Sequence, residues 1–154
     1  MTYKIAAYQS NMHDQLVDIW HRSVRATHHF LTEEDIAFFY TMVSGGVLAA
    51  VEIWTAVDQA GSPLGFIGLD GKKVEMLFVD PQSHGQGIGK ALLTHAIELK
   101  GTDLEVDVNE QNEGAHAFYI RFGFEQIGRS PLDGSGKPYP LLHLKLRTRE
   151  DSNS

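Results

Sequence analysis

Three glycines separated by single residues stand where the chain could bind a phosphate group. Gly85, Gly87 and Gly89 follow an apolar run at residues 74–79 and precede residues with helical apolar spacing. This order of strand, turn and helix suits an anion, because glycine lets the backbone approach a ligand with its N–H groups facing outward. The start of the helix adds unpaired N–H groups and a partial positive charge. The sequence therefore predicts a phosphate or diphosphate site in this turn.

Two common phosphate-binding patterns fit this segment less well. A P-loop requires glycine five residues before Gly89, where His84 stands, and Ser or Thr after Lys90, where alanine stands. The dinucleotide fingerprint requires a third glycine that is missing, although Glu105 and Asp107 lie at a suitable distance for a ribose. A P-loop NTPase is therefore disfavoured, and a nucleotide-binding oxidoreductase stays open as the weakest hypothesis.

The turn fits better with a different motif, and a second motif follows it. Residues 84–89 resemble the coenzyme-A-binding pattern Gln/Arg-x-x-Gly-x-Gly/Ala of the GNAT (N-acetyltransferase) superfamily, with His84 in the first place. Residues 109–124 resemble the second motif of that superfamily, which is matched by Asn112, Ala115, Phe118, Tyr119, Gly123 and Phe124. Residues 19–31 and 133–142 are similar to a bacterial subgroup, the YjaB-type acetyltransferases. The resemblance covers nearly the whole chain and implies an N-acetyltransferase.

By this resemblance the cofactor is acetyl-CoA, and its binding residues are Leu77, Phe78, Val79, His84, Gly85, Gln86, Gly87, Ile88, Gly89, Lys90, Asn112 and Phe118. The backbone of the first three would bind the pantetheine arm, as an extended ligand adds to a strand edge. His84 departs from the Gln or Arg of the family, and histidine is shorter and mostly neutral at pH 7. We therefore expect weaker or pH-dependent cofactor binding.

Tyr119 and Glu75 are the candidates for catalysis. Attack of an amine on a thioester expels a thiolate, to which a phenol with a pKa near ~10 can donate a proton. The family uses a tyrosine at the position of Tyr119 in this way. A lysine-like amine has a pKa near ~10.4, so a base helps, and many relatives carry one where Glu75 stands. His28 and His29 are alternative bases. If they have no catalytic role, Tyr119 is a half-buried aromatic residue of its helix and Glu75 is a charged residue that faces solvent.

The acceptor pocket is expected between the first two helices, their connection and a late loop. Its candidate residues are Trp20, His28, Phe30 and Tyr139. All four are equally suited to packing, and Trp20 lies on an apolar helix face. The acceptor is expected to be a small-molecule or peptide amine. The acetyl group would pass to it directly from acetyl-CoA in a ternary complex. A non-catalytic acyl-CoA-binding module is the alternative.

Composition limits the classes of function. The 154 residues fit one acetyl-CoA-binding domain at 1–147 and a polar tail at 148–154. A formal net charge of −7 disfavours nucleic acid and mildly favours a cationic amine. The chain lacks cysteine, a signal peptide and any stretch of membrane-spanning length, which predicts a cytoplasmic protein without membrane contact. Its eight histidines lack metal-site spacing, so no metal is expected. A homodimer is among the assemblies left open.

The elements that must position these residues follow from periodicity and turn signals. Strands are predicted at residues 3–8, 52–57, 64–69, 74–79, 104–109, 124–128 and 141–146. Helices are predicted after Asn11, after Thr32, after the glycine turn and at residues 113–122. The order predicts an α/β fold of the GNAT type, with a mostly antiparallel mixed sheet of six to seven strands flanked by about four helices.

Overall fold

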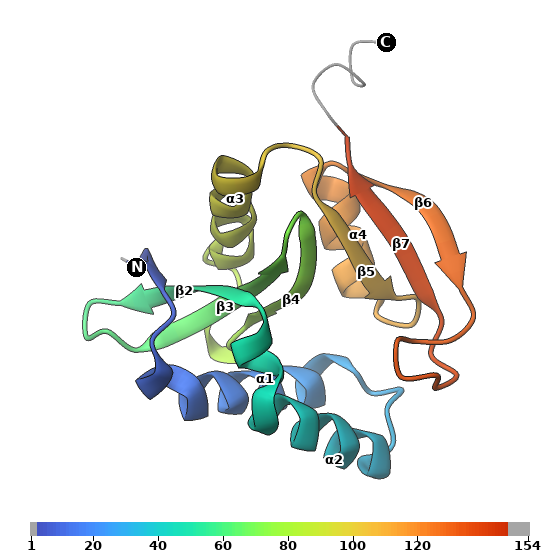
Figure 1. Cartoon of the computed structure of the whole chain (residues 1–154), viewed down its shortest axis with the longest axis horizontal. Coiled ribbons are helices and arrows are strands. Elements are labelled where there is room, and N and C mark those ends of the chain that lie inside the picture. The colour runs from blue at the N-terminus through green and yellow to red at the C-terminus, as the bar shows by residue number, and fades with distance from the viewer. Residues whose placement is uncertain (1–2, 148–154) are drawn as a thin grey trace.

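The computed structural model describes residues 3–147 and shows a seven-stranded mixed sheet with helices on both faces (Figure 1). The strands are β1 Tyr3–Ala7, β2 Glu52–Asp58, β3 Pro63–Asp70, β4 Lys73–Val79, β5 Glu105–Asn109, β6 Phe124–Ser130 and β7 Leu141–Leu146. The α-helices are α1 His13–Thr27, α2 Glu33–Met42, α3 Ile88–Lys100 and α4 Glu113–Phe122. The predicted fold class is confirmed. The predicted tail at 148–154 lies outside the described residues, and within 3–147 no helix has the length and hydropathy of a membrane span.

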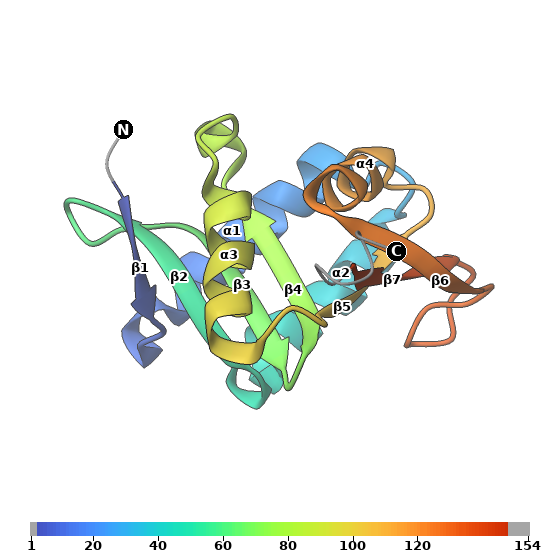
Figure 2. The same cartoon turned by 90° about the horizontal axis from the view of Figure 1, so that it is seen from above.

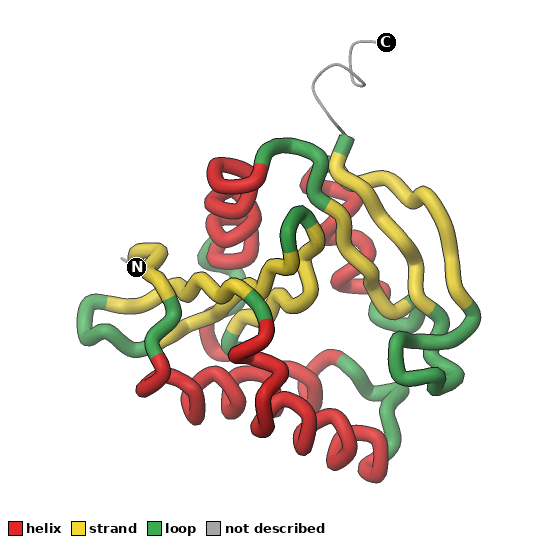
Figure 3. Tube along the Cα trace, in the orientation of Figure 1, coloured by secondary structure: helices red, strands yellow, loops and turns green. Residues whose placement is uncertain are grey.

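Two hydrophobic clusters hold the helices against opposite faces of the sheet. On one face α1 and α2 pack through Trp20 and Ile36 onto Phe66 of β3. On the other face α3 and α4 pack over β3 to β7, with Leu92 of α3 and Ile67 of β3 in the same cluster. Figures 2 and 3 show the same arrangement from above and by type of element. The period of 3.6 in α1 and the alternation in the strands produce these two buried faces.

The sheet divides where its parallel pair of strands meets. The strand order is β1-β2-β3-β4-β5-β7-β6, and β4 with β5 is the parallel pair among the described strands. These two strands pair at Lys73↔Glu105 and Val74↔Val106, and beyond that they diverge (Figure 2). The rest of β4 is therefore paired with β3 on one side and is not paired with β5 on the other.

Local signals explain most helix ends. The Thr32 side chain accepts a hydrogen bond from the N–H of Asp35 at 3.1 Å, as the predicted helix start required. Gly123 ends α4 with φ 129°, a conformation that favours glycine. The prediction that Asn11 caps the first helix is wrong. Asn11 lies in a 3₁₀ turn, Ser10–Met12, and α1 begins after it without a side-chain cap.

Candidate active site

The glycine turn presents free N–H groups at the start of α3. Gly85 and Gly87 adopt φ of 84° and 76°, which other residues rarely take. The first helical hydrogen bond runs from the N–H of Ala91 to the Gly87 carbonyl, at 2.9 Å. The N–H groups of residues 88–90 therefore lack partners within the helix, as at any helix start. Free N–H groups of this kind suit an anion, and the prediction of a phosphate site in this turn rests on them.

Gly89 has a different task from the other two glycines. A Cβ at Gly89 would lie 3.2 Å from Cζ of Phe118. The missing side chain lets the Phe118 ring from α4 approach the first turn of α3. The third glycine thus joins the two motifs that the sequence analysis singled out.

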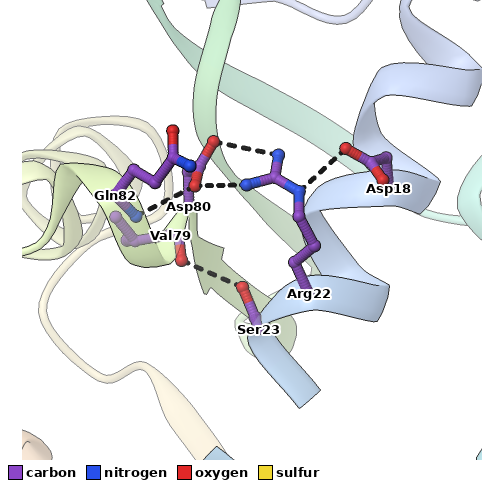
Figure 4. A network of polar contacts seen from close by, with 6 residues as sticks. All are labelled: Asp18, Arg22, Ser23, Val79, Asp80 and Gln82. Carbon is purple, nitrogen blue, oxygen red and sulfur yellow. Dashed lines mark hydrogen bonds and ion pairs between the residues drawn. The ribbon is translucent and has the colours of Figure 1, made fainter. Parts of the chain in front are cut away.

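An ion-pair clamp from α1 fixes the end of β4 before the turn (Figure 4). The Arg22 guanidinium donates to both carboxylate oxygens of Asp80 at 2.6 and 3.0 Å, and to Asp18 at 2.9 Å. These bonds keep the pKa of the Asp80 carboxyl below its usual range. The Ser23 hydroxyl donates to the Val79 carbonyl at 2.9 Å. Sequence reasoning missed this clamp, because its halves lie 56 and 58 residues apart.

Backbone groups of β4 face the side from which β5 diverges. Hydrogen-bonded residues alternate along an antiparallel pair. The N–H of Asp80 donates to the Leu64 carbonyl at 2.8 Å, so Phe78, two residues earlier, also bonds toward β3. Leu77 and Val79 therefore direct their backbone groups to the other side, where the Val79 carbonyl already accepts from the Ser23 hydroxyl. This is the strand edge that the resemblance assigns to an extended ligand.

Tyr119 is buried on the α3 and α4 side of that edge. Its side chain is 6% exposed, and its ring lies between Phe118 and Phe124, with centroids 5.3 Å from each. Leu77 and Val79 pack against the same hydrophobic cluster. Burial raises the pKa of the Tyr119 phenol, so that it stays protonated at physiological pH. The phenol is thus kept in its proton-donating form.

Glu75 is the extra residue of a β-bulge. β3 pairs Gly68 with Met76 and Leu69 with Val74, which leaves Glu75 without a partner. Its side chain is exposed, one residue beyond the last position at which β4 pairs with β5. Bulges redirect side chains beside active sites. The alternation of the sequence did not reveal this bulge.

Three of the four predicted acceptor residues come together in one aromatic row. The Phe30 ring centroid lies 5.3 Å from that of His28 and 5.7 Å from that of Tyr139. The Tyr139 hydroxyl donates to the Asp35 carboxylate, and the Lys137 ammonium group lies 2.9 Å from the same carboxylate. These contacts lower the pKa of Asp35. The late loop is thereby tied to the connection of α1 and α2, through contacts that the sequence analysis missed.

His28 is a neutral imidazole held at both nitrogens. The Thr27 hydroxyl donates to the Ser23 carbonyl at 2.7 Å, so it accepts from His28 Nδ1 at 2.8 Å. His28 Nε2 then accepts from Asn112 Nδ2 at 3.4 Å. Burial, with a smaller effect of His29, lowers the pKa of His28 to about 4. Such an imidazole is a weak base, which argues against His28 for proton removal.

The remaining predicted residues lie apart from the aromatic row. Trp20 lies on the buried face of α1, and its ring is next to those of His21 and Tyr40. His84 is exposed on the glycine turn. Lys90 lines a shallow groove of about 360 Å³ between α3 and β1. Among the described residues no group of three His, Asp or Glu side chains is arranged to hold a metal ion.

Comparison with known proteins places this geometry in a family context. The sequence model of the acetyltransferase (GNAT) domain matches residues 49–126. The chain is 46% identical over 131 residues to peptidyl-lysine N-acetyltransferase YjaB of Salmonella typhimurium, covering 85% of this chain and 89% of that protein. The Escherichia coli protein of that name is 44% identical over 131 residues, with 85% and 88% covered.

Solved structures show the same fold. The solution structure of the apo form of Escherichia coli YjaB matches with a TM-score of 0.87 at 40% identity, covering 94% of this chain and 97% of that one. The PaiA N-acetyltransferase of Thermoplasma acidophilum, solved with coenzyme A, matches with a TM-score of 0.77 at 18% identity, covering 96% and 100%. The second match concerns the fold alone.

Proposed function

Because the chain belongs to the GNAT acetyltransferase family and is an acyltransferase, we propose that it moves the acetyl group of acetyl-CoA directly to a primary amine in a ternary complex. The names of the two YjaB relatives support a protein lysine side chain as the acceptor. One observation carries the proposal: the open backbone edge of β4 leads directly into the free N–H groups of α3, with Tyr119 in the same hydrophobic cluster. We also propose that the reaction takes place in the cytoplasm.

The residues fit acetyl-CoA as a donor at three points. The N–H groups at positions 88–90 would hold the diphosphate. Gly85 and Gly87, with positive φ and no side chains, leave the backbone of the turn accessible to it. The backbone of Leu77 and the N–H of Val79 would bind the pantetheine amides as a neighbouring strand does, because the Val79 carbonyl already accepts from Ser23. Asn112 caps α4 through a bond from the N–H of Ala115 at 3.1 Å, so its support of the site is through the position of that helix.

Two side chains would assist the transfer. Glu75, exposed on its bulge, would take the proton that the acceptor amine must lose, either directly or through water. Tyr119 would donate a hydrogen bond to the sulfur as the thiolate leaves, and burial, which raises the pKa of its phenol, favours this role over full proton transfer. His28, Phe30 and Tyr139 would form a wall of the acceptor site.

Release of free coenzyme A thiol with and without an amine tests the proposal. The acceptors are lysine-containing peptides, Nα-acetyl-lysine amide and small polyamines. We expect thiol release only with an acceptor, and initial-rate patterns that intersect as a ternary complex requires. Tyr119→Phe should lower kcat at least tenfold, about 1.4 kcal/mol of barrier. Tyr40→Phe is the matched control, because that tyrosine is 41% exposed on α2.

Two results would argue against the proposal. Binding of acetyl-CoA without turnover over the whole acceptor panel would favour an acyl-CoA-binding module. An unchanged kcat in Tyr119→Phe would remove that phenol from the mechanism. Glu75→Gln distinguishes the two possible roles of Glu75. Loss of a general base should shift the dependence of kcat/KM on pH, whereas loss of a surface charge should not.

A further inference from the structure

A serine, a histidine and a carboxylate from three neighbouring strands are hydrogen-bonded in series. Ser130 Oγ lies 2.6 Å from His143 Nε2, and His143 Nδ1 lies 2.6 Å from Asp107 Oδ1. The residues belong to β6, β7 and β5, and β7 lies between the other two strands in the sheet. A nucleophile, a base and an orienting carboxylate in this order can activate a hydroxyl for acyl transfer.

The three side chains lie on the opposite face of the sheet from Tyr119. Asp107 and His143 are direct partners across β5 and β7. Their neighbours Val106 and Leu144 are buried in the cluster that contains Tyr119. Because successive strand residues point to opposite faces, Asp107 and His143 point away from α4. The group therefore lies on the other face of the sheet from the proposed proton donor Tyr119, and Lys73 connects it to the strand that carries Glu75.

A bulge in β6 brings Ser130 onto that face. β6 pairs Gln126 with Leu144 and Gly128 with His143, so Ile127 is an extra residue. A shift of one residue reverses the faces of a strand. Without the extra residue Ser130 would share the core-facing side of Gln126. The bulge thus aligns the serine with the histidine.

The protonation states make the serine the hydrogen-bond donor. Burial raises the pKa of the Asp107 carboxyl, but hydrogen bonds from Lys73 and His143 more than offset this and lower it, so the group is ionised at neutral pH. A carboxylate only accepts hydrogen bonds, so His143 Nδ1 carries a proton, and in the neutral imidazole Nε2 accepts from the Ser130 hydroxyl. Lys73 holds the other carboxylate oxygen at 2.8 Å and fixes its orientation.

The group is held firmly but can be reached from solvent. The His143 side chain is 32% exposed and that of Asp107 24%. A Cβ at Gly128 would lie 3.4 Å from His143 Cδ2, so the imidazole packs directly over the backbone of β6. Ser130 itself is half-buried, so its hydroxyl lies at the surface of the sheet beside the exposed part of His143.

We propose that Ser130 is a second acyl-transfer centre, which accepts acyl groups from small activated esters and thioesters. The Ser130 oxygen bonds to the acyl carbon while its proton passes to His143 Nε2. The bond from the acyl carbon to the leaving oxygen or sulfur breaks, and His143 protonates that leaving group. Water attacks the resulting ester in the same way, releases the carboxylic acid and restores the hydroxyl. A general base contributes about 10²–10⁴-fold to such steps.

To test this, the full chain is treated with p-nitrophenyl acetate, and the acetylated residues are located by tandem mass spectrometry. Hydroxylamine removes esters and leaves amides, which separates acetyl-serine from acetyl-lysine. In samples quenched with acid at early times, before water releases the acetyl group, we expect acetylation of Ser130 that is absent in Ser130→Ala and forms at least tenfold more slowly in His143→Gln. Ser62→Ala is the matched control, because Ser62 is also half-buried but lies in the turn between β2 and β3.

The dependence on pH gives a second test that needs no variant. A serine assisted by histidine reacts faster as pH rises through the range where histidines titrate, and then levels off. An unassisted serine reacts in proportion to hydroxide and does not level off. Absence of acetyl on Ser130, an equal rate in folded His143→Gln, or a rate proportional to hydroxide would each overturn the proposal.

Discussion

Replacing Asn112 by aspartate should change the protonation of His28 while keeping the helix cap. Asn112 Oδ1 accepts from the N–H of Ala115 at 3.1 Å, a task that a carboxylate performs equally well. Asn112 Nδ2 lies 3.4 Å from His28 Nε2, where a carboxylate has no hydrogen to donate. The variant therefore exchanges a donor for a negative charge, and the imidazolium form of His28 gains a partner.

The magnitude follows from the distance and from the burial of the ring. Two unit charges at the 3.4 Å of the present contact attract by about 5 kcal/mol at an effective dielectric constant of ~20. A nearby opposite charge shifts a pKa by roughly 1 to 3 after desolvation. The pKa of His28, about 4 in the native protein, should therefore rise to between roughly 5 and 7 in Asn112→Asp.

The same shift changes the dependence of stability on pH. In the native protein the pKa of His28 is lowered from 6.5 to about 4, so the unfolded state binds the proton first as pH falls. Stability present above pH 6.5 is therefore lost toward pH 4, by about 1–2 kcal/mol once the partial exposure of the ring is allowed for. In Asn112→Asp most of this loss should disappear.

Ring nitrogen NMR during a pH titration measures the pKa of His28 directly, and thermal melts at pH 7 and pH 5 measure the loss of stability. Asn11→Asp is the matched control, since it adds the same charge in the exposed 3₁₀ turn before α1. A native His28 that titrates near 6.5, or a pKa that does not move in Asn112→Asp, would refute the reasoning.

Three further predictions concern the glycine turn and its support. Gly89→Val should destabilise the fold by about 1–3 kcal/mol and weaken acetyl-CoA binding, because the Phe118 ring must move; denaturant unfolding and calorimetry measure both. Arg22→Met should cost about 1–3 kcal/mol at pH 7, because the Asp80 side chain, 14% exposed, loses its charged donors. The difference from the native protein should shrink as acid protonates Asp80, whose pKa is lowered by Arg22, and melts over an acid pH series would show it. His84→Arg should tighten acetyl-CoA binding modestly by adding donors on the exposed turn, and a calorimetric titration without a gain would contradict this.

Local patterns in the chain were sufficient for most of the elements and for the conformation of the glycine turn. The strand at residues 74–79, the turn with positive φ at Gly85 and Gly87, and the helix after it follow from local preferences, and the structure has them. The cap at Thr32 and the helix end at Gly123 were equally local. The wrong cap at Asn11 came from a short 3₁₀ turn whose signal resembles that of a helix start.

Contacts between distant segments could not be predicted in this way. Asp35 meets Tyr139 across 104 residues, and Arg22 meets Asp80 across 58. No spacing rule connects such pairs, because their distance in sequence says nothing about their distance in space. The bulges at Glu75 and Ile127 also depend on the partner strand, and a bulge decides which face each following side chain takes.

The amino-acid sequence by itself determined which segments form strands and helices and where an anion can meet free backbone N–H groups, since these follow from the preferences of neighbouring residues. The tertiary structure alone decided which side chains meet: Phe118 over Gly89, His28 with Asn112, and Ser130 with His143. The physical reason is that pairing register and helix packing are set by burial of the whole apolar surface. A single residue lost from the bulge of β6 would turn Ser130 away from His143 while leaving the local signals of the other elements unchanged.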